Sequence, residues 1–145
     1  MKALSFAAAI ISFPVLAVPA TAGDVSITVT GAVPNGSRVF VALCSNSLEP
    51  SSCHIGESKM AQTPTVKFAF ANVEPARYAI LAFQDLEGTG ILERSKLGLP
   101  LEPFALSNNA GRTGKPTFEA AAVTVGPSGG EFQLGLRSLR HGVDQ

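Results

Sequence analysis

The run of residues 77–84 constrains the fold more than any other segment, because it is apolar at nearly every position. Its apolar side chains include Tyr78, Ile80, Leu81 and Phe83. A strand that is apolar on both faces usually lies in the centre of a sheet, or is partly covered by a loop. The rest of the chain must therefore supply neighbouring strands for this segment and a cover for each of its faces.

Further segments alternate apolar with polar residues, or form short apolar runs between turn residues. We predict strands at residues 24–31, 38–44, 64–71, 118–125 and 131–137. In the third of them, Val66, Phe68 and Phe70 would face the core. The alanine-rich fourth could be helical, but it ends in the β-branched sequence VTV. Short strands separated by turns, without a long amphipathic helix, predict an all-β fold, a small antiparallel β-sandwich.

The connections between these strands carry different signals. Residues 34–36, Pro-Asn-Gly, suit a tight turn, so we expect the first two strands to pair as a hairpin. Residues 54–63 are polar, without clear periodicity, and are predicted to be irregular. Residues 86–117 form a connection of about thirty residues, which is long for a compact domain and too rich in leucine to lie free in water. We expect one long ordered loop folded over the sheet, with a short helical turn near 102–107.

The N-terminal segment has the anatomy of a secretory signal peptide. Lys2 precedes an apolar run at 3–18, and a small-x-small cleavage site ends at Ala22. The run is short for a membrane span, although an uncleaved anchor is the alternative. We therefore predict a signal peptide at 1–22 and one β-sandwich domain at 23–145, which is 145 − 22 = 123 residues, without a transmembrane segment. We expect export to the periplasm, and secretion from the cell is the alternative.

The charge balance narrows the classes of partner. The chain has 11 basic and 11 acidic side chains, and losing Lys2 with the leader would leave one basic side chain fewer. Such a balance gives no electrostatic reason to expect a nucleic acid or an anionic membrane surface as partner.

The cysteine count indicates a disulfide. Cys44 and Cys53 are the only cysteines, and an even pair in an exported chain is expected to be oxidised. Metal binding and a redox pair are the alternatives. No further cysteine is present to bind a metal, and the spacing differs from that of a CxxC motif.

Sparse motifs in the second half of the chain resemble a known family. They are Y-A at 78–79, D-x-x-x-x-G-x-L at 85–92, G-x-P-x-E at 98–102, S-N-N at 107–109 and P-x-F-x-x-A at 116–121. This series is similar to that of a bacterial exported family, domain of unknown function 2141 (DUF2141), over about residues 31–136. The resemblance implies a transthyretin-like or prealbumin-like β-sandwich with no established activity. The sequence departs from the pattern at Glu87 and Thr89, where the family has asparagine, and at Glu93, where it has aspartate.

In the segment that follows the central strand, the oxygen-bearing residues are spaced like the ligands of a calcium-binding loop. Its ligands would be the side-chain oxygens of Asp85, Glu87, Thr89 and Glu93 and the backbone carbonyl of Ile91. Position six is the glycine that permits the sharp turn, but position twelve is a lysine where an EF-hand has a bidentate glutamate. A weak calcium site is one hypothesis, and a glycine-rich turn with solvated acids is the alternative. No other cofactor is expected.

Acidic side chains of the same connection could also supply the carboxylate pair of a hydrolase. The candidates are Asp85, Glu87, Glu93 and Glu102. A Ser-His-Asp triad would need His54, beside the cysteine loop, or His141, in the C-terminal tail, and no serine lies in a nucleophile elbow. We therefore expect no enzyme activity and assign no catalytic residue.

Polar residues later in the connection are candidates for ligand binding. Glu102, Ser107, Asn108 and Asn109 combine donors and acceptors that could bind a sugar or a peptide, or could instead hold the loop to its own backbone. The sequence thus favours an exported, non-enzymatic binding or structural module of the cell envelope, whose partner is an envelope protein or a small ligand. A weakly calcium-binding structural domain and a hydrolase using loop carboxylates are the alternatives.

Overall fold

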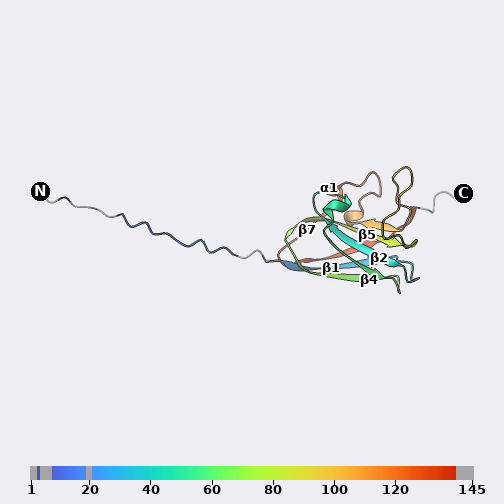
Figure 1. Cartoon of the computed structure of the whole chain (residues 1–145), viewed down its shortest axis with the longest axis horizontal. Helices are drawn as coiled ribbons and strands as arrows, with labels where there is room; N and C mark the ends of the chain where they lie inside the picture. The colour runs from blue at the N-terminus through green and yellow to red at the C-terminus, as the bar shows by residue number, and fades with distance from the viewer. Residues whose placement is uncertain (1–2, 4–7, 19–20, 140–145) are drawn as a thin grey trace.

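Two packed β-sheets form the body of the protein in a computed structural model that describes residues 3, 8–18 and 21–139. The strands are β1 (Gly23–Thr30), β2 (Arg38–Cys44), β3 (Ile55–Met60), β4 (Val66–Val73), β5 (Ala76–Asp85), β6 (Phe104–Leu106), β7 (Ala122–Val125) and β8 (Gly130–Gly135). The short helices are η1 (Pro50–Ser52), η2 (Ser107–Asn109) and α1 (Phe118–Ala121). The first sheet has the order β4-β1-β8, and the second has the order β3-β2-β5-β6, with β7 also paired to β5. The sheets lie face to face (Figure 1), and the predicted all-β sandwich is confirmed.

Alternate residues of each strand build the interior between the sheets. On β1, Val25, Ile27 and Val29 are completely buried, and the residues between them are at least partly exposed. A strand with one face in the core has this period of two. The same pattern on β4 confirms the predicted core face of Val66, Phe68 and Phe70.

β5 is the central strand of the second sheet, as its apolar sequence predicts. It pairs with β2 along one edge, and with β7 and then β6 along the other. Ile80 and Ala82 face the core between the sheets, as does Tyr78, whose hydroxyl donates to the Glu74 carbonyl at 2.9 Å. The opposite face of β5 is covered by a second apolar cluster, in which Ala79 lies beside residues of the disulfide loop, β6 and α1.

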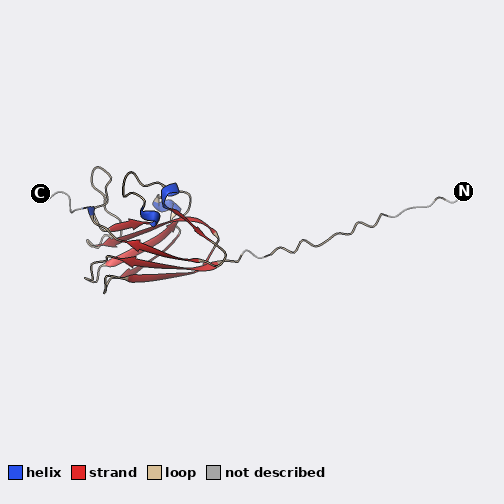
Figure 2. Cartoon of the chain, turned by 180° about the vertical axis from the view of Figure 1, so that it is seen from behind, coloured by secondary structure: helices blue, strands red, loops and turns tan. Residues whose placement is uncertain are grey.

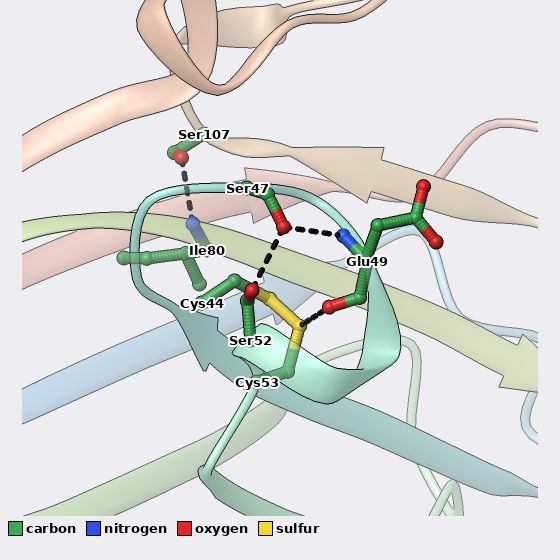
Figure 3. Close-up of a disulfide and its surroundings, with 7 residues drawn as sticks. All are labelled: Cys44, Ser47, Glu49, Ser52, Cys53, Ile80 and Ser107. Carbon is green, nitrogen blue, oxygen red and sulfur yellow. Dashed lines mark hydrogen bonds between the residues drawn. A yellow bond between two sulfur atoms is a disulfide. The ribbon is translucent and has the colours of Figure 1, made fainter.

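The predicted disulfide between Cys44 and Cys53 is confirmed (Figure 3). It ties the end of β2 to the residues just before β3. Within the loop that it closes, the Ser47 and Ser52 hydroxyl oxygens lie 2.8 Å apart, and the Glu49 N–H donates to the Ser47 hydroxyl at 3.2 Å. The loop is thus ordered by its own polar groups, and it covers part of the outer face of the second sheet.

The predicted hairpin between the first two strands is wrong, because β1 and β2 lie in different sheets. Both edges of β1 are taken, by β4 and by β8, so the connection 31–37 must cross to the other sheet. The fully buried Gln84 fixes this crossing. Its Oε1 accepts the Val33 N–H at 2.8 Å, and its Nε2 donates to the Val33 carbonyl and to the Ser37 hydroxyl, each at 2.7 Å.

Residues 54–63, predicted to be irregular, contain the strand β3. Within the described residues β3 pairs only with β2, and few of its side chains are buried, so its sequence lacks apolar alternation. Lys59 of β3 reaches towards the edge of the other sheet. Its ammonium donates to the Lys67 carbonyl at 2.8 Å and lies 5.3 Å from the centre of the Phe68 ring. A charged side chain on an edge strand also discourages pairing with another chain.

The predicted antiparallel arrangement holds except for β8, which runs parallel to β1. Beyond β8, the backbone of Arg137 exchanges two hydrogen bonds, each of 3.0 Å, with Phe104 of β6. These bonds join the two sheets along one side of the sandwich. They link residues far apart in the sequence, which local pattern cannot reveal.

Two short helices are placed differently from the prediction. The strand predicted at 118–125 is wrong for residues 118–121, which form the single turn α1, and right for 122–125, which form β7. Thr117 favours the helical turn by capping it, since its hydroxyl accepts the Ala120 N–H at 3.1 Å. The helical turn predicted near 102–107 is wrong, because residues 104–106 pair with β5 as β6 and the turn η2 follows.

The predicted signal peptide lies partly outside the described residues, which omit 1–2, 4–7 and 19–20, as well as 140–145 of the predicted domain. Residues 8–18 contain no helix or strand and run away from the sandwich (Figures 1 and 2). Their large apolar side chains are exposed, Ile10 by 92% and Val15 by 93%. β1 begins at Gly23, directly after the predicted cleavage site. Within the described ranges, no helix has the length and hydropathy to cross a bilayer.

Candidate functional site

The long connection after β5 folds as a series of ordered pieces. A turn at residues 85–90, called here the Asp85 turn, is followed by a hairpin at 93–101, called the tip hairpin. β6 and η2 come next, and then a loop at 110–117. Figures 1 and 2 show two loops projecting on the side of the second sheet that faces away from β1 and β4.

Asp85, the last residue of β5, organises the turn that carries its name. Its side chain is buried, and its two oxygens accept the N–H of Thr89 at 3.0 Å and the N–H of Gly90 at 2.7 Å. Gly88 and Gly90 have positive φ values of 72° and 76°, which allow the backbone to fold around the carboxylate. The acid therefore binds its own loop, as a backbone nest binds an anion.

Glu102, which precedes β6, binds both ends of the segment 86–93. It is only 2% exposed. Its Oε1 accepts the Leu86 N–H at 3.0 Å, and its Oε2 accepts the Glu93 N–H at 3.4 Å. A single buried side chain thus fixes both the first residue after β5 and the first residue of the tip hairpin.

The environments of these two carboxyl groups push their pKa values apart. Burial acts to raise the pKa of Asp85, but hydrogen bonds from the backbone of Gly90, Thr89 and Gly88 and from the Glu102 side chain outweigh it, so that the pKa lies below its ordinary value. Burial also raises the pKa of Glu102, and the neighbouring Asp85 adds to the rise, so that it lies above its ordinary value despite bonds from backbone N–H groups. Of the two, Glu102 binds a proton more readily.

The tip hairpin projects beyond this pair of acids. The Leu101 N–H donates to the Glu93 carbonyl at 2.9 Å, and the Ser95 N–H donates to the Leu99 carbonyl at 2.8 Å. The prediction that the leucines of the connection pack onto the sheet is wrong here, since Leu97 is 86% exposed and Leu99 is 51% exposed. The hairpin can stand away from the sheet because its backbone groups bond to one another.

The predicted ligand-binding residues after β6 differ in how many hydrogen bonds their side chains make within the protein. Ser107 is buried, and its hydroxyl accepts the Ile80 N–H at 2.9 Å (Figure 3) and donates to the Ala121 carbonyl. The Asn108 amide donates to the first carbonyl of β7 at 3.0 Å. Asn109 is exposed and lines a small cavity of about 70 Å³. Ligand binding by this set, which also contains the buried Glu102, stays a prediction.

The predicted calcium ligands have other contacts within the turn. Asp85 binds backbone N–H groups, and the Thr89 hydroxyl donates to the Ile91 carbonyl at 3.1 Å. Glu87 is exposed and Glu93 is half-buried. In the part of the chain that the structure describes, no three Asp, Glu, His or Cys side chains gather as metal ligands would. Calcium binding stays a prediction, and it would require the turn to exchange its internal hydrogen bonds for the ion.

A shallow hollow lies between the Asp85 turn and β2, with a volume of about 520 Å³. It is lined by the whole Asp85 turn and by Gly36, Ser37, Arg38, Phe40 and Met60. The half-buried Phe40 ring stacks on Phe83, with centroids 5.0 Å apart and planes 7° from parallel. On its other side Phe40 lies opposite the small Ser58 of β3, whose hydroxyl accepts a hydrogen bond from the Arg38 guanidinium at 3.2 Å. The hollow therefore combines an aromatic ring with exposed charge from Arg38 and Glu87.

Residues 27–133 match the model of a protein family described as an uncharacterised protein conserved in bacteria, DUF2141. The match runs from β1 to β8 and includes the Asp85 turn, the tip hairpin and the hollow. The chain belongs to this family. The DUF2141 description assigns no activity, so membership confirms the resemblance seen in the sequence and leaves the function to be argued from the site. No curated protein and no solved structure matches the chain.

Sequence reasoning missed two sets of contacts that support the hollow. Gln84 was counted with the apolar run before it, although its three hydrogen bonds hold the crossing between the sheets. Phe40 and Phe83 were assigned to separate strands, and only the register of β2 against β5 brings their rings together. The sequence did hold a signal for this pair, because each phenylalanine alternates with the core residues of its strand and so lies on the opposite face of the sheet.

Proposed function

We propose that this DUF2141 protein is an exported, non-enzymatic binding module of the bacterial cell envelope, and that it holds a small ligand in the hollow beside the Asp85 turn. The observation that carries the proposal is the hollow itself. Its volume of about 520 Å³ is in the range of small-molecule sites, which span roughly 300–1,000 Å³. Its lining mixes a half-buried aromatic ring with exposed charge.

Export is supported by the N-terminal sequence and by the disulfide. The apolar side chains of residues 8–18 contact no core. If these residues stayed on the mature domain, their side chains would remain in water at a considerable cost in free energy. Removal of a leader ending at Ala22 would leave β1 intact from its first residue, Gly23. The Cys44–Cys53 disulfide is of the kind that persists in an oxidising compartment such as the periplasm.

A non-enzymatic role is supported by the contacts of the loop acids. The side-chain oxygens of the buried pair, Asp85 and Glu102, accept hydrogen bonds from backbone N–H groups and so hold the connection in shape. A general acid or base needs a carboxyl group within hydrogen-bond reach of the substrate. The more accessible acid in the hollow is Glu87, and a lone exposed carboxylate offers no paired chemistry for hydrolysis.

The lining suggests a ligand with an apolar face and at least one anionic group. Phe40 and Met60 offer apolar surface, and the Arg38 guanidinium offers a cation that can bind a carboxylate. Soluble peptidoglycan fragments combine N-acetylated sugars with peptide carboxylates, and they are a component of the compartment to which the protein is proposed to be exported. They are therefore the probe that we choose.

An NMR titration tests the proposal. The ¹⁵N-labelled protein is titrated with soluble peptidoglycan fragments, and the expected result is saturable shift changes at Gly36, Ser37 and the amides of the Asp85 turn. Arg38→Gln and Phe40→Leu should each raise the dissociation constant from this titration about tenfold, because each removes one charged hydrogen bond or one stacking contact. Lys67→Gln, on the exposed face of β4, is the matched control and should leave them unchanged. Shift changes that are absent, or that survive both substitutions in the hollow, would contradict the proposal.

A further inference from the structure

We propose that the tip hairpin and the loop at 110–117 form a contact site for anionic lipid, at which the leucines of the hairpin enter the bilayer interface. This inference goes beyond the ligand proposed for the hollow and depends on different residues. It begins from the side chains at the tip. Leu97 and Leu99 project into water from an ordered hairpin, and Ile91 at its base is 64% exposed.

The hairpin holds these leucines outward. Besides the paired backbone hydrogen bonds, the Ser95 hydroxyl accepts the N–H groups of Leu97 and Leu99, each at 3.3 Å. The Arg94 guanidinium donates to the Gly98 carbonyl at 3.0 Å, which closes the tip from its other side. The tip is therefore shaped before any partner arrives, so contact with a partner would order few further groups.

Charge is distributed unevenly along the chain, and the projecting loops are basic. Residues 93–117, from the start of the tip hairpin to the end of the loop, contain four basic side chains, Arg94, Lys96, Arg112 and Lys115, and two acids, Glu93 and Glu102, giving a formal charge of 4 − 2 = +2 on a chain of net charge zero. All four basic side chains are exposed, whereas Glu102 is buried and Glu93 is half-buried. The balanced total therefore conceals a basic, leucine-tipped surface on one side of the sandwich.

A lipid surface fits this tip better than a folded partner does. A standard protein–protein interface buries roughly 800 Å² on each partner, and a hairpin of nine residues with two leucines at its tip offers a small part of that area. A bilayer interface needs no complementary shape, because it accepts apolar side chains a few ångströms deep while basic side chains meet anionic headgroups. Leu97 and Leu99, which follow Arg94 and Lys96 in the tip hairpin, supply the apolar contribution, and the two basic side chains supply the charge.

Vesicle co-sedimentation tests the inference. The full chain is expressed with its own N-terminus and purified from the envelope fraction, and every variant is confirmed by mass to have the same processed form. Vesicles of phosphatidylglycerol with phosphatidylcholine are compared with vesicles of phosphatidylcholine alone. We expect binding to the anionic vesicles that weakens as salt shortens the screening length. The doubly substituted Leu97→Ser/Leu99→Ser protein should bind about a hundredfold more weakly, and Lys96→Gln about fivefold more weakly.

Matched controls separate the tip from general apolar or basic surface. Met60→Ser removes a side chain that is 57% exposed at the hollow, and Lys67→Gln removes a charge from the other sheet; both should bind as the unsubstituted protein does. Unchanged thermal melts of the tip variants would show that the fold is intact. The inference is overturned if anionic vesicles do not sediment the protein at low salt, or if the double leucine variant binds as strongly as the Met60→Ser control. Neither result bears on the hollow, whose test uses soluble fragments.

Discussion

Replacing each of the two buried carboxyl groups by its amide should have unequal effects on stability and opposite effects on its pH dependence, although the substitutions are chemically the same. In Asp85→Asn the side chain keeps one oxygen, and its NH₂ group must face a backbone N–H that had been bound by carboxylate. That N–H belongs to Thr89 or to Gly90, at 3.0 Å and 2.7 Å in the native protein. In Glu102→Gln the remaining oxygen can keep the Leu86 N–H, and the NH₂ group can donate to the Asp85 carboxylate.

The hydrogen bonds give the size of the difference. A hydrogen bond to a charged group contributes about 1.5–3 kcal/mol, and a buried donor left unpaired costs a similar amount, so Asp85→Asn should lower the free energy of unfolding by about 2–3 kcal/mol. For a domain of this size the melting temperature should fall by about 10 °C. Glu102→Gln gives up one long bond, of 3.4 Å to the Glu93 N–H, and should stay within about 1 kcal/mol of the unsubstituted protein at neutral pH.

The pH dependence of stability supplies the sign of each effect. The pKa of Asp85 is lowered by folding, so its contribution is present above the unfolded pKa and is lost as the pH falls through the folded pKa. The pKa of Glu102 is raised by folding, so its contribution is complete below the ordinary value of 4.5 and is lost as the pH rises through the folded pKa. Glu102→Gln should abolish this second loss, and Asp85→Asn should abolish the first.

Urea unfolding followed by far-UV circular dichroism, at a series of pH values from acid to neutral, measures all three proteins. The reasoning would be refuted if the two variants lost equal stability at neutral pH, or if Glu102→Gln were the more damaging. Unchanged slopes of unfolding free energy against urea concentration would show that the denatured states are comparable.

Three other perturbations have defined outcomes. Replacing both Cys44 and Cys53 by serine should lower the free energy of unfolding by about 2–3 kcal/mol, as measured in urea, because the unfolded chain gains freedom; an unaltered midpoint would contradict this. Gln84→Leu should cost about 3 kcal/mol, since it leaves the Val33 N–H and carbonyl unpaired; a loss below about 1 kcal/mol would mean that the crossing does not depend on this side chain. Thermal melts in EDTA and in millimolar calcium should superimpose if the Asp85 turn is held by its own backbone, and a calcium-dependent rise in melting temperature would restore the metal hypothesis.

Local pattern was sufficient where one strand face is buried. The alternation of Val25, Ile27 and Val29 predicted β1, and the uniformly apolar sequence of β5 predicted a central strand, because burial on one face or on two leaves a direct trace in the sequence. Pattern failed at β3, which is an edge strand with few buried side chains. It also failed at the supposed first hairpin, since which strands pair is decided by contacts between distant segments.

The sequence singled out the long connection, whose role as a site stays a prediction, but the geometry gives its acids other contacts than those expected. Asp85 and Glu102 stood out as acids in a glycine-rich sequence, and a sequence cannot say whether a carboxylate faces solvent or its own backbone. The exposed Leu97 and Leu99 looked like core residues, because a hairpin that satisfies its own backbone bonds leaves no local sign that its tip faces water. The ring pair of Phe40 and Phe83 depended on strand register alone.

The central claim is that the two buried acids, Asp85 and Glu102, hold the backbone of the long connection, which leaves the surface around them for the binding proposed above. The most direct test is an NMR pH titration that follows the side-chain carboxyl carbons of Asp85 and Glu102 together with nearby amides. The account predicts that Asp85 titrates below its ordinary value and moves the Thr89 and Gly90 amides with it, while Glu102 titrates above its ordinary value and moves the Leu86 amide. Ordinary pKa values for both groups, with these amides unmoved, would contradict it.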